Sequence, residues 1–215
     1  MEGFRYIAVE GPIGVGKSAL AKLLAEDFKA QLILEEPDEN PFLPSFYGDT
    51  SQFAFQTQLF FLLSRYRQQL QLKQQDLFQG MAICDYIFAK DHIFAQLNLS
   101  PAELDLYSQI FRLLDKQLPK PDVVIFLQAH PDVLLKRIKK RGKAYEDEIN
   151  PDYVRSLSQG YSDYFFRYRD APLLVVNASD LDFVGRSRDY ETLKQELYTL
   201  VKSGKSVHYV TINQT

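Results

Sequence analysis

Short apolar runs alternate along this chain with longer segments in which apolar residues recur at helical spacing. Val123–Leu127 and Leu173–Val176 are near-continuous apolar runs, the pattern of parallel strands that are buried on both faces. Ile7–Val9, Leu32–Leu34 and Ala82–Asp85 are shorter runs that predict three further strands. Because helical segments separate these runs, the pattern predicts an α/β fold with a five-stranded parallel sheet flanked by helices.

Helical periodicity predicts most of the connections between the strands. Ala19 to Phe28 form the first helical segment, and the others cover residues 52–73, 101–118, 132–141, 152–168 and 189–202. Ser100 to Glu103 form a capping box with proline at the first helical position. Residues 40–50 are rich in proline, glycine and aromatics and predict a loop. Residues 206–212 are long enough for one more short strand.

Composition favours a small-molecule partner over a polymer or a membrane. The 215 residues are 46% hydrophobic, enough for one core, and the net charge of −3 provides no basic footprint for nucleic acid or an anionic membrane. The single cysteine, Cys84, cannot form an internal disulfide, and no apolar run reaches the length of a membrane span. We therefore expect one cytoplasmic domain, residues 1–215, without a nucleic-acid or membrane partner.

A glycine-rich loop follows the first predicted strand and opens the first predicted helix. Residues 11–18 match the pattern G-x-x-x-x-G-K-[ST], in which backbone N–H groups converge on phosphate oxygens. Lys17 would reach the β and γ oxygens, and Ser18 would ligate Mg²⁺. The expected donor-binding residues in this loop are Gly11, Gly14, Val15, Gly16, Lys17, Ser18 and Ala19. The motif predicts a nucleoside triphosphate and Mg²⁺, but it does not by itself define a kinase.

Carboxylates and cations elsewhere lie where a phosphate chemistry would use them. Glu35 and Glu36 precede Pro37, which cannot continue a central strand, so both lie at the carboxyl end of a strand, where α/β sheets bind ligands. Residues 136–143 include six cations, and most of them read as a solvated helix face. Arg137 and Arg141 differ, because a spacing of four places them on one face just before a glycine.

An ordered set of motifs resembles the deoxynucleoside kinase family, above all its bacterial deoxyadenosine and deoxyguanosine kinases. The motifs are Glu35-Glu36-Pro37, Asn40-Pro41-Phe42-Leu43, Phe46-Tyr47, Phe55-Gln56-Thr57, Asp85, Arg137, Arg141-Gly142-Lys143, Glu146 and Asp182-Phe183. The resemblance extends from the first strand to about residue 185. It implies a three-layer P-loop NTPase fold with a lid at about residues 137–150, and transfer of the γ-phosphoryl group of ATP to the 5'-hydroxyl of a deoxynucleoside.

The resemblance also implies roles for individual residues. Glu36 would be the general base, with Glu35 a bystander, and Arg137 and Arg141 would join Lys17 in stabilising the transferred phosphoryl group. The implied nucleoside-binding residues are Glu36, Tyr47, Phe55, Gln56, Asp85 and Glu146. Arg141, Asp182 and Phe183 would add to the ATP site, and Asp85 would join Ser18 at Mg²⁺. A homodimer is implied as well; the apolar helix faces near Phe60 and Phe111 are surfaces that could form its interface.

Two departures from the family pattern bear on the acceptor site. Many members have an arginine directly after the acid, whereas this chain has Asp85-Tyr86 with Lys90 five residues beyond the acid, so the arginine's role is unfilled or transferred. Arg65 lies further from Gln56 than the corresponding pair in animal members. Both departures concern which nucleoside is accepted; residues 40–43 favour a purine by resemblance.

Two other functions share this sequence pattern. A nucleoside monophosphate kinase of the thymidylate kinase type would need cations near the acceptor phosphate and no carboxylate base there, so Glu36 and the missing arginine disfavour it. A non-catalytic nucleotide-binding subunit would follow from decay of the phosphate loop, but Lys17 and Ser18 are both present. A deoxynucleoside kinase is the function that the sequence favours.

Overall fold

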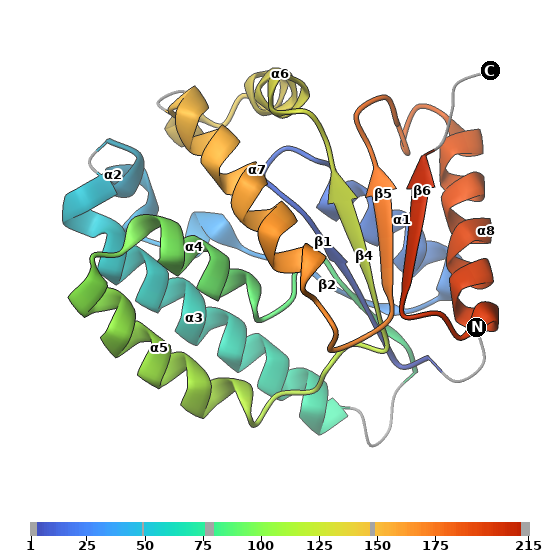
Figure 1. Cartoon of the computed structure of the whole chain (residues 1–215), viewed down its shortest axis with the longest axis horizontal. Helices are drawn as coiled ribbons and strands as arrows, with labels where there is room; N and C mark the ends of the chain where they lie inside the picture. The colour runs from blue at the N-terminus through green and yellow to red at the C-terminus, as the bar shows by residue number, and fades with distance from the viewer. Residues whose placement is uncertain (1–3, 49, 76–79, 147–148, 212–215) are drawn as a thin grey trace.

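A computed structural model describes residues 4–48, 50–75, 80–146 and 149–211, and its centre is a parallel β-sheet (Figure 1). The strands are β1 (Tyr6–Glu10), β2 (Gln31–Ile33), β3 (Ala82–Cys84), β4 (Val123–Gln128), β5 (Leu173–Asn177) and β6 (Val207–Thr211). Their order in the sheet is β2-β3-β1-β4-β5-β6, and every pairing is parallel. The five predicted strands are confirmed, and residues 207–211 add a sixth at the edge, so the sheet has six strands rather than five.

Eight α-helices and two short 3₁₀ turns connect the strands within the described residues. They are α1 (Lys17–Phe28), η1 (Pro37–Glu39), α2 (Leu43–Gly48), α3 (Thr50–Gln75), α4 (Lys90–Asn98), α5 (Pro101–Asp115), α6 (Pro131–Arg141), η2 (Ala144–Glu146), α7 (Pro151–Phe166) and α8 (Ser187–Ser203). The six predicted helices are confirmed, with small differences at their ends.

Two helices were not predicted, for identifiable reasons. α2 lies inside the segment expected to be a loop, and that prediction is wrong because Leu43 and Phe46, three residues apart, bury one helical face, while Pro44 lies in the first turn, where proline is tolerated. In α4 the buried positions include Lys90 and Asp91 as well as apolar residues, so the helix lacks a plain apolar stripe.

The alternation of side chains along the strands forms two cores, one on each face of the sheet. Ile7 and Val9 of β1 pack in one core with residues of α1 and α8. Tyr6 and Ala8 point to the opposite face and pack in a second core with residues of α7. Figure 1 shows α7 crossing in front of the sheet and α1 behind it. The result is the three-layer arrangement that the sequence predicts.

Helices α3, α4 and α5 pack on one another beside the sheet rather than across it (Figure 1). Their shared core contains Leu62, Phe88 and Tyr107, and the ring of Phe88 stacks on that of Phe111 at 5.1 Å. The amino-terminal half of α3 is held next to the carboxyl ends of the strands by its contacts with α2 and α4. These contacts leave room for a site between α3 and the phosphate loop.

The single cysteine lies within the sheet. Cys84 ends β3, is fully buried, and is a free thiol. Burial raises the pKa of this thiol above its ordinary value. Within the described residues, none of the helices has the length and apolar character needed to cross a membrane.

Candidate active site

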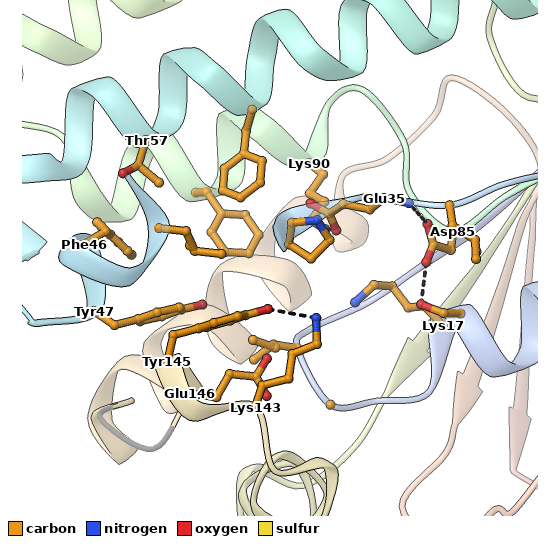
Figure 2. A pocket seen from close by; sticks show the side chains of 18 of the residues that line it. Lys17, Glu35, Phe46, Tyr47, Thr57, Asp85, Lys90, Lys143, Tyr145 and Glu146 are labelled. Atoms are coloured by element: carbon orange, nitrogen blue, oxygen red, sulfur yellow. Dashed lines mark hydrogen bonds and ion pairs between the residues drawn. The ribbon is translucent and has the colours of Figure 1, made fainter. Parts of the chain in front are cut away.

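A cavity of about 370 Å³ opens at the carboxyl ends of the strands. It is bounded by the phosphate loop, the end of β2, helices α2 and α3, the start of α4, and the segment that follows α6 (Figure 2). Segments more than 100 residues apart in the sequence thus meet around one space, which is the usual place for a ligand in a parallel α/β sheet.

The phosphate loop has the tight backbone that its glycines permit. Gly11 adopts a φ of 150°, and a Cβ atom there would lie only 2.2 Å from the carbonyl oxygen of Leu127. The ammonium group of Lys17 donates to the carbonyl oxygens of Gly11 at 2.8 Å and Pro12 at 3.2 Å. Burial and the like charge of Lys90 lower the pKa of Lys17 to about 8. An anion in the loop would therefore bind next to a desolvated cation.

Asp85 joins the phosphate loop to the end of β2. Its carboxylate accepts a hydrogen bond from the Ser18 hydroxyl at 2.5 Å and another from the backbone N–H of Glu35 at 2.7 Å (Figure 2). One hydroxyl and one carboxylate are what Mg²⁺ requires from a protein when phosphate oxygens and water complete its coordination. No cluster of three or more metal-ligating His, Cys, Asp or Glu side chains occurs among the described residues.

The structure reverses the positions expected for Glu35 and Glu36. Glu35 lines the cavity opposite Lys17, whereas Glu36 is exposed and does not line it. The expectation that Glu36 faces the phosphate loop is therefore wrong in its placement. The reason is local: β2 ends at Ile33, and beyond it the Glu35 N–H is held by Asp85, which turns the Glu35 side chain inward.

Both oxygens of Glu35 contact cations. Arg65 of α3 binds Oε1, and Lys90 of α4 binds Oε2. Burial acts to raise the pKa of Glu35, but the charges of Arg65 and Lys90 outweigh it, so the pKa is lowered below its ordinary value. Glu35 is thus held ionised and in a defined orientation at the edge of the cavity.

Lys90 supplies a cation next to Glu35, in a chain that has Tyr86 where many family members have an arginine directly after the acid. Tyr86, the residue after the acid, is buried and donates its hydroxyl hydrogen to Gln68, away from Glu35. Lys90 lines the cavity and lies 5.6 Å from the centre of the Phe94 ring. The cation therefore comes from the first residue of α4 instead of from the end of β3.

The amide that faces the cavity is Gln58, not Gln56. Gln58 is buried and lines the cavity together with Phe61 and Arg65, whereas Gln56 is exposed on the other side of α3. Two residues rotate the helix by about 200°, which explains the difference. Phe55 is also misplaced by the sequence prediction, because it packs against the core of α3 and α5 and does not line the cavity.

The Gln58 face of α3 could have been recognised from spacing. Gln58, Phe61 and Arg65 stand at positions i, i+3 and i+7, the pattern of one helical face. Arg65 also binds Asp91 of α4, and both groups are almost fully buried. The Nε atom of Arg65 and the Oδ2 atom of Asp91 have no protein partner. The far end of the cavity is consequently rich in oriented donors and acceptors.

Tyr47 and Glu146 both line the cavity, as predicted for a sugar-binding pair, although their role stays a prediction. Their partners are new: the ring of Tyr145 stacks on that of Tyr47 with centres 6.0 Å apart and an interplanar angle of 3° (Figure 2). Arg141 donates to Glu146 from Nε at 3.0 Å and from Nη2 at 2.5 Å. Arg141 thus lines the cavity, and its guanidinium group forms an ion pair with Glu146.

The segment after α6 is tied to the turn after β2. Lys143 donates to both carboxylate oxygens of Asp38 at 2.8 Å, and the Tyr145 hydroxyl donates to Asp38 at 2.6 Å. Lys143 and Tyr145 also bond each other at 2.9 Å. These contacts cover one side of the cavity. Residues 147–148, which belong to the predicted lid, lie outside the described residues.

The remaining candidates lie on the donor side. Arg137 donates to the backbone carbonyl of Val15 and to carbonyls that follow β5, so it does not line the cavity. Asp182 accepts hydrogen bonds from the N–H groups of Val184 and Gly185, which folds the loop on itself. Phe183 is buried in the core. The structure thus places these residues near the phosphate loop but in supporting positions.

A phosphate loop at the carboxyl edge of a parallel sheet, opposite a carboxylate-lined cavity, defines a P-loop phosphotransferase. The family model described as deoxynucleoside kinase matches residues 7–202. The chain belongs to the deoxynucleoside kinase family, which confirms the resemblance seen in its motifs. Of the functions that the sequence left open, this finding supports the nucleoside kinase.

Individual relatives agree over most of their length. The chain is 36% identical to a deoxyguanosine kinase of Bacillus subtilis, over 91% of this chain and 97% of the relative. It is 31% identical to a deoxyadenosine kinase of Lactobacillus acidophilus, over 88% of this chain and 93% of the relative. The solved structure of a deoxyadenosine kinase from M. mycoides with bound dATP matches with a TM-score of 0.79 at 26% identity, covering 90% of this chain and 99% of that one.

Proposed function

We propose that this enzyme transfers the γ-phosphoryl group of ATP to the 5'-hydroxyl of a purine deoxynucleoside, deoxyguanosine or deoxyadenosine, with Glu35 as the general base. The observation that carries the proposal is the position of Glu35, whose carboxylate lines the cavity opposite Lys17 while Glu36 is exposed. A hydroxyl loses a proton as it attacks phosphorus, so a carboxylate at this point assists the reaction. A phosphate acceptor would gain nothing from such a carboxylate.

The low pKa of Glu35 is compatible with this role. Phosphoryl transfer proceeds through a loose transition state, so the hydroxyl proton leaves late and the alignment of the attacking oxygen matters most. Arg65 and Lys90 hold the two carboxylate oxygens in place and keep the group ionised. Glu35 would orient the 5'-hydroxyl as an acceptor of its hydrogen bond and take the proton as the new P–O bond forms.

The phosphate loop and Asp85 would serve the donor side. Backbone N–H groups of residues 11–18 would bind the phosphates of ATP, and Lys17 would exchange its two carbonyl contacts for phosphate oxygens. Ser18 and Asp85, already hydrogen-bonded to each other, would hold Mg²⁺. When bound, Mg²⁺ neutralises charge that develops on the phosphate oxygens. Arg141 would contribute a further cation once ATP competes for it with Glu146.

The acceptor base would lie against α3 and α4. An amide offers a donor and an acceptor together, and Gln58 is the buried amide that lines the cavity beside Arg65. Phe61 and Phe94 line the same region and would stack on the base. Tyr47 and Glu146 would hold the sugar 3'-hydroxyl. The purine preference rests on relatives that are deoxyguanosine and deoxyadenosine kinases.

The test is a matched pair of substitutions at the two adjacent glutamates. Glu35→Gln should lower kcat about 10²- to 10⁴-fold, because it removes the base while keeping the shape of the side chain. Glu36→Gln should change kcat less than about threefold, as expected for an exposed side chain. ADP formation is measured with ATP, Mg²⁺ and each of the four deoxynucleosides. A crippled Glu36→Gln beside an active Glu35→Gln would reverse the assignment, and rapid phosphorylation of a monophosphate would replace the function.

We also propose that the enzyme is a homodimer and that it acts in the cytoplasm. The support for the dimer is a set of large apolar side chains that are exposed. They are Leu63 on α3, Leu106 and Leu113 on α5, Leu97 on α4, and Phe166 at the end of α7. Light scattering of the wild type, Leu113→Glu and Phe166→Glu would show whether a dimer forms and which face it uses; a monomeric wild type would refute it.

A further inference from the structure

Arg137 lies between two loops that belong to different parts of the chain. From the middle of α6 its Nη1 atom donates to the carbonyl oxygen of Val15, in the phosphate loop, at 3.2 Å. Its Nη2 atom donates to carbonyls in the turn after β5: Ala178 at 3.0 Å, Ser179 at 3.3 Å and Leu181 at 2.8 Å. One guanidinium group thus joins four backbone acceptors from segments more than 160 residues apart.

A second contact attaches the phosphate loop to the same helix. Gly14 has a φ of 80°, and a Cβ atom there would lie 2.9 Å from both the Leu134 carbonyl oxygen and the Ile138 side chain. Backbone therefore packs directly on backbone, and Arg137 lies within one turn of that contact. Helix α6 is the common support of the phosphate loop and of residues 178–181.

These contacts occupy both Nη atoms of Arg137. Burial lowers the pKa of Arg137 from its ordinary value, and Asp180 and Asp182 oppose the shift. A planar guanidinium with several fixed N–H donors can bridge two loops, whereas a lysine ammonium on a flexible stem cannot do so at the same time. Arg137 therefore bridges the two loops and does not direct its charge into the cavity.

We propose that Arg137 is a positioning residue that sets the spacing between the phosphate loop and the loop of residues 178–185, and so determines affinity for the donor nucleotide. The inference rests on the proposed function, in which the phosphate loop binds ATP, and on the expectation from the family resemblance that the loop of residues 182–183 lies beside the ATP base. ATP can contact both loops only if their separation suits it. Loss of Arg137 would leave four carbonyls without this donor and release the second loop.

Nucleotide binding tests the inference without any acceptor. Calorimetry with Mg²⁺–ADP should show a dissociation constant about 10- to 100-fold higher for Arg137→Ala, the range for lost charge-assisted hydrogen bonds. Arg137→Lys should recover little of this affinity, whereas Lys136→Ala, an exposed cation one residue away, should bind as the wild type does. With saturating ATP, kcat of the Arg137 variants should stay within about threefold of the wild type.

Limited proteolysis provides a second readout. Trypsin should cleave native Arg137→Ala and Arg137→Lys after Arg186 about fivefold faster than the wild type or Lys136→Ala, because the loop opens more often. Unchanged ADP affinity and cleavage, with a fall in kcat that Arg137→Lys restores, would overturn the inference and assign Arg137 to the transferred phosphoryl group. If the wild type fails to phosphorylate any deoxynucleoside, the proposed function fails, while the binding and cleavage results still decide on Arg137.

Discussion

Replacing Lys90 by methionine tests whether the charge of Lys90 stabilises the ionised form of the proposed general base, Glu35. Lys90→Met keeps the length of the side chain and its packing against Phe94 but removes the charge from Glu35 Oε2. A single neighbouring charge moves a carboxyl pKa by about 1 to 3 units. Because Arg65 still binds Oε1, we expect the pKa of Glu35 to rise by about 1.5 units, which corresponds to about 2 kcal/mol.

The sign of the effect follows from the lowered pKa of Glu35. A carboxyl group whose pKa is lowered by folding stabilises the protein above its unfolded pKa and loses that contribution as the pH falls through its folded pKa. Lys90→Met should therefore lower the free energy of unfolding by about 2 kcal/mol at pH 7. The difference from the wild type should persist through pH 4, because the unfolded chain titrates alike in both proteins, and should shrink only as the pH falls through the folded-state pKa of Glu35 in the variant. In parallel, kcat/KM near neutral pH should fall without a change in its pH profile, because Glu35 stays ionised but loses one of the two cations that hold its carboxylate in place.

Two measurements decide the matter. Urea unfolding between pH 4 and 9 reports the free energy of unfolding, and steady-state phosphorylation of a deoxynucleoside over the same range reports kcat/KM. Lys139→Met on the exposed side of α6 removes an equal charge and serves as the control. If kcat/KM and the unfolding free energy of Lys90→Met coincide with those of the control, Lys90 does not support Glu35, and the arginine missing after Asp85 has no replacement.

Two further substitutions probe the opposite ends of the cavity. Gln58→Leu should weaken deoxynucleoside binding about 10-fold or more in calorimetry, since an unpaired base edge costs about 1 to 3 kcal/mol, whereas Gln56→Leu should bind normally; equal affinities would place the base elsewhere. Asp38→Asn should free Lys143 and Tyr145 and speed amide hydrogen exchange over residues 143–146. The same opening should appear in the wild type only as the pH falls through the pKa of Asp38, which Lys143 and Tyr145 lower. Unchanged exchange would show that these contacts do not close the segment.

Local patterns predicted the fold and the phosphate loop well. The loop is continuous in sequence, and each parallel strand is an apolar run, so neither needs knowledge of distant contacts. The glutamate pair was different, because a strand alternates its side chains only while it remains a strand. β2 ends at Ile33, and the orientation of Glu35 depends on a hydrogen bond to Asp85, 50 residues away.

The errors on the helices have related causes. In the glutamine-rich stretch of α3 the identity of the base-facing amide depends on helix phase, and the family motif centred on Gln56 missed that face by two residues. Arg137 and Arg141 share a helix face, as their spacing indicates, but the sequence does not show which acceptors lie opposite. The structure supplies backbone carbonyls for one and Glu146 for the other.

The burial of Cys84 has a practical consequence for experiments on this enzyme. The thiolate is the form that reacts with alkylating reagents, and a buried thiol with a raised pKa seldom forms it. A cysteine introduced at an exposed position such as Lys139 can therefore carry a single fluorophore while the native residue remains. Conversely, slow labelling of Cys84 itself reports how often β3 opens and carries Asp85 away from Ser18.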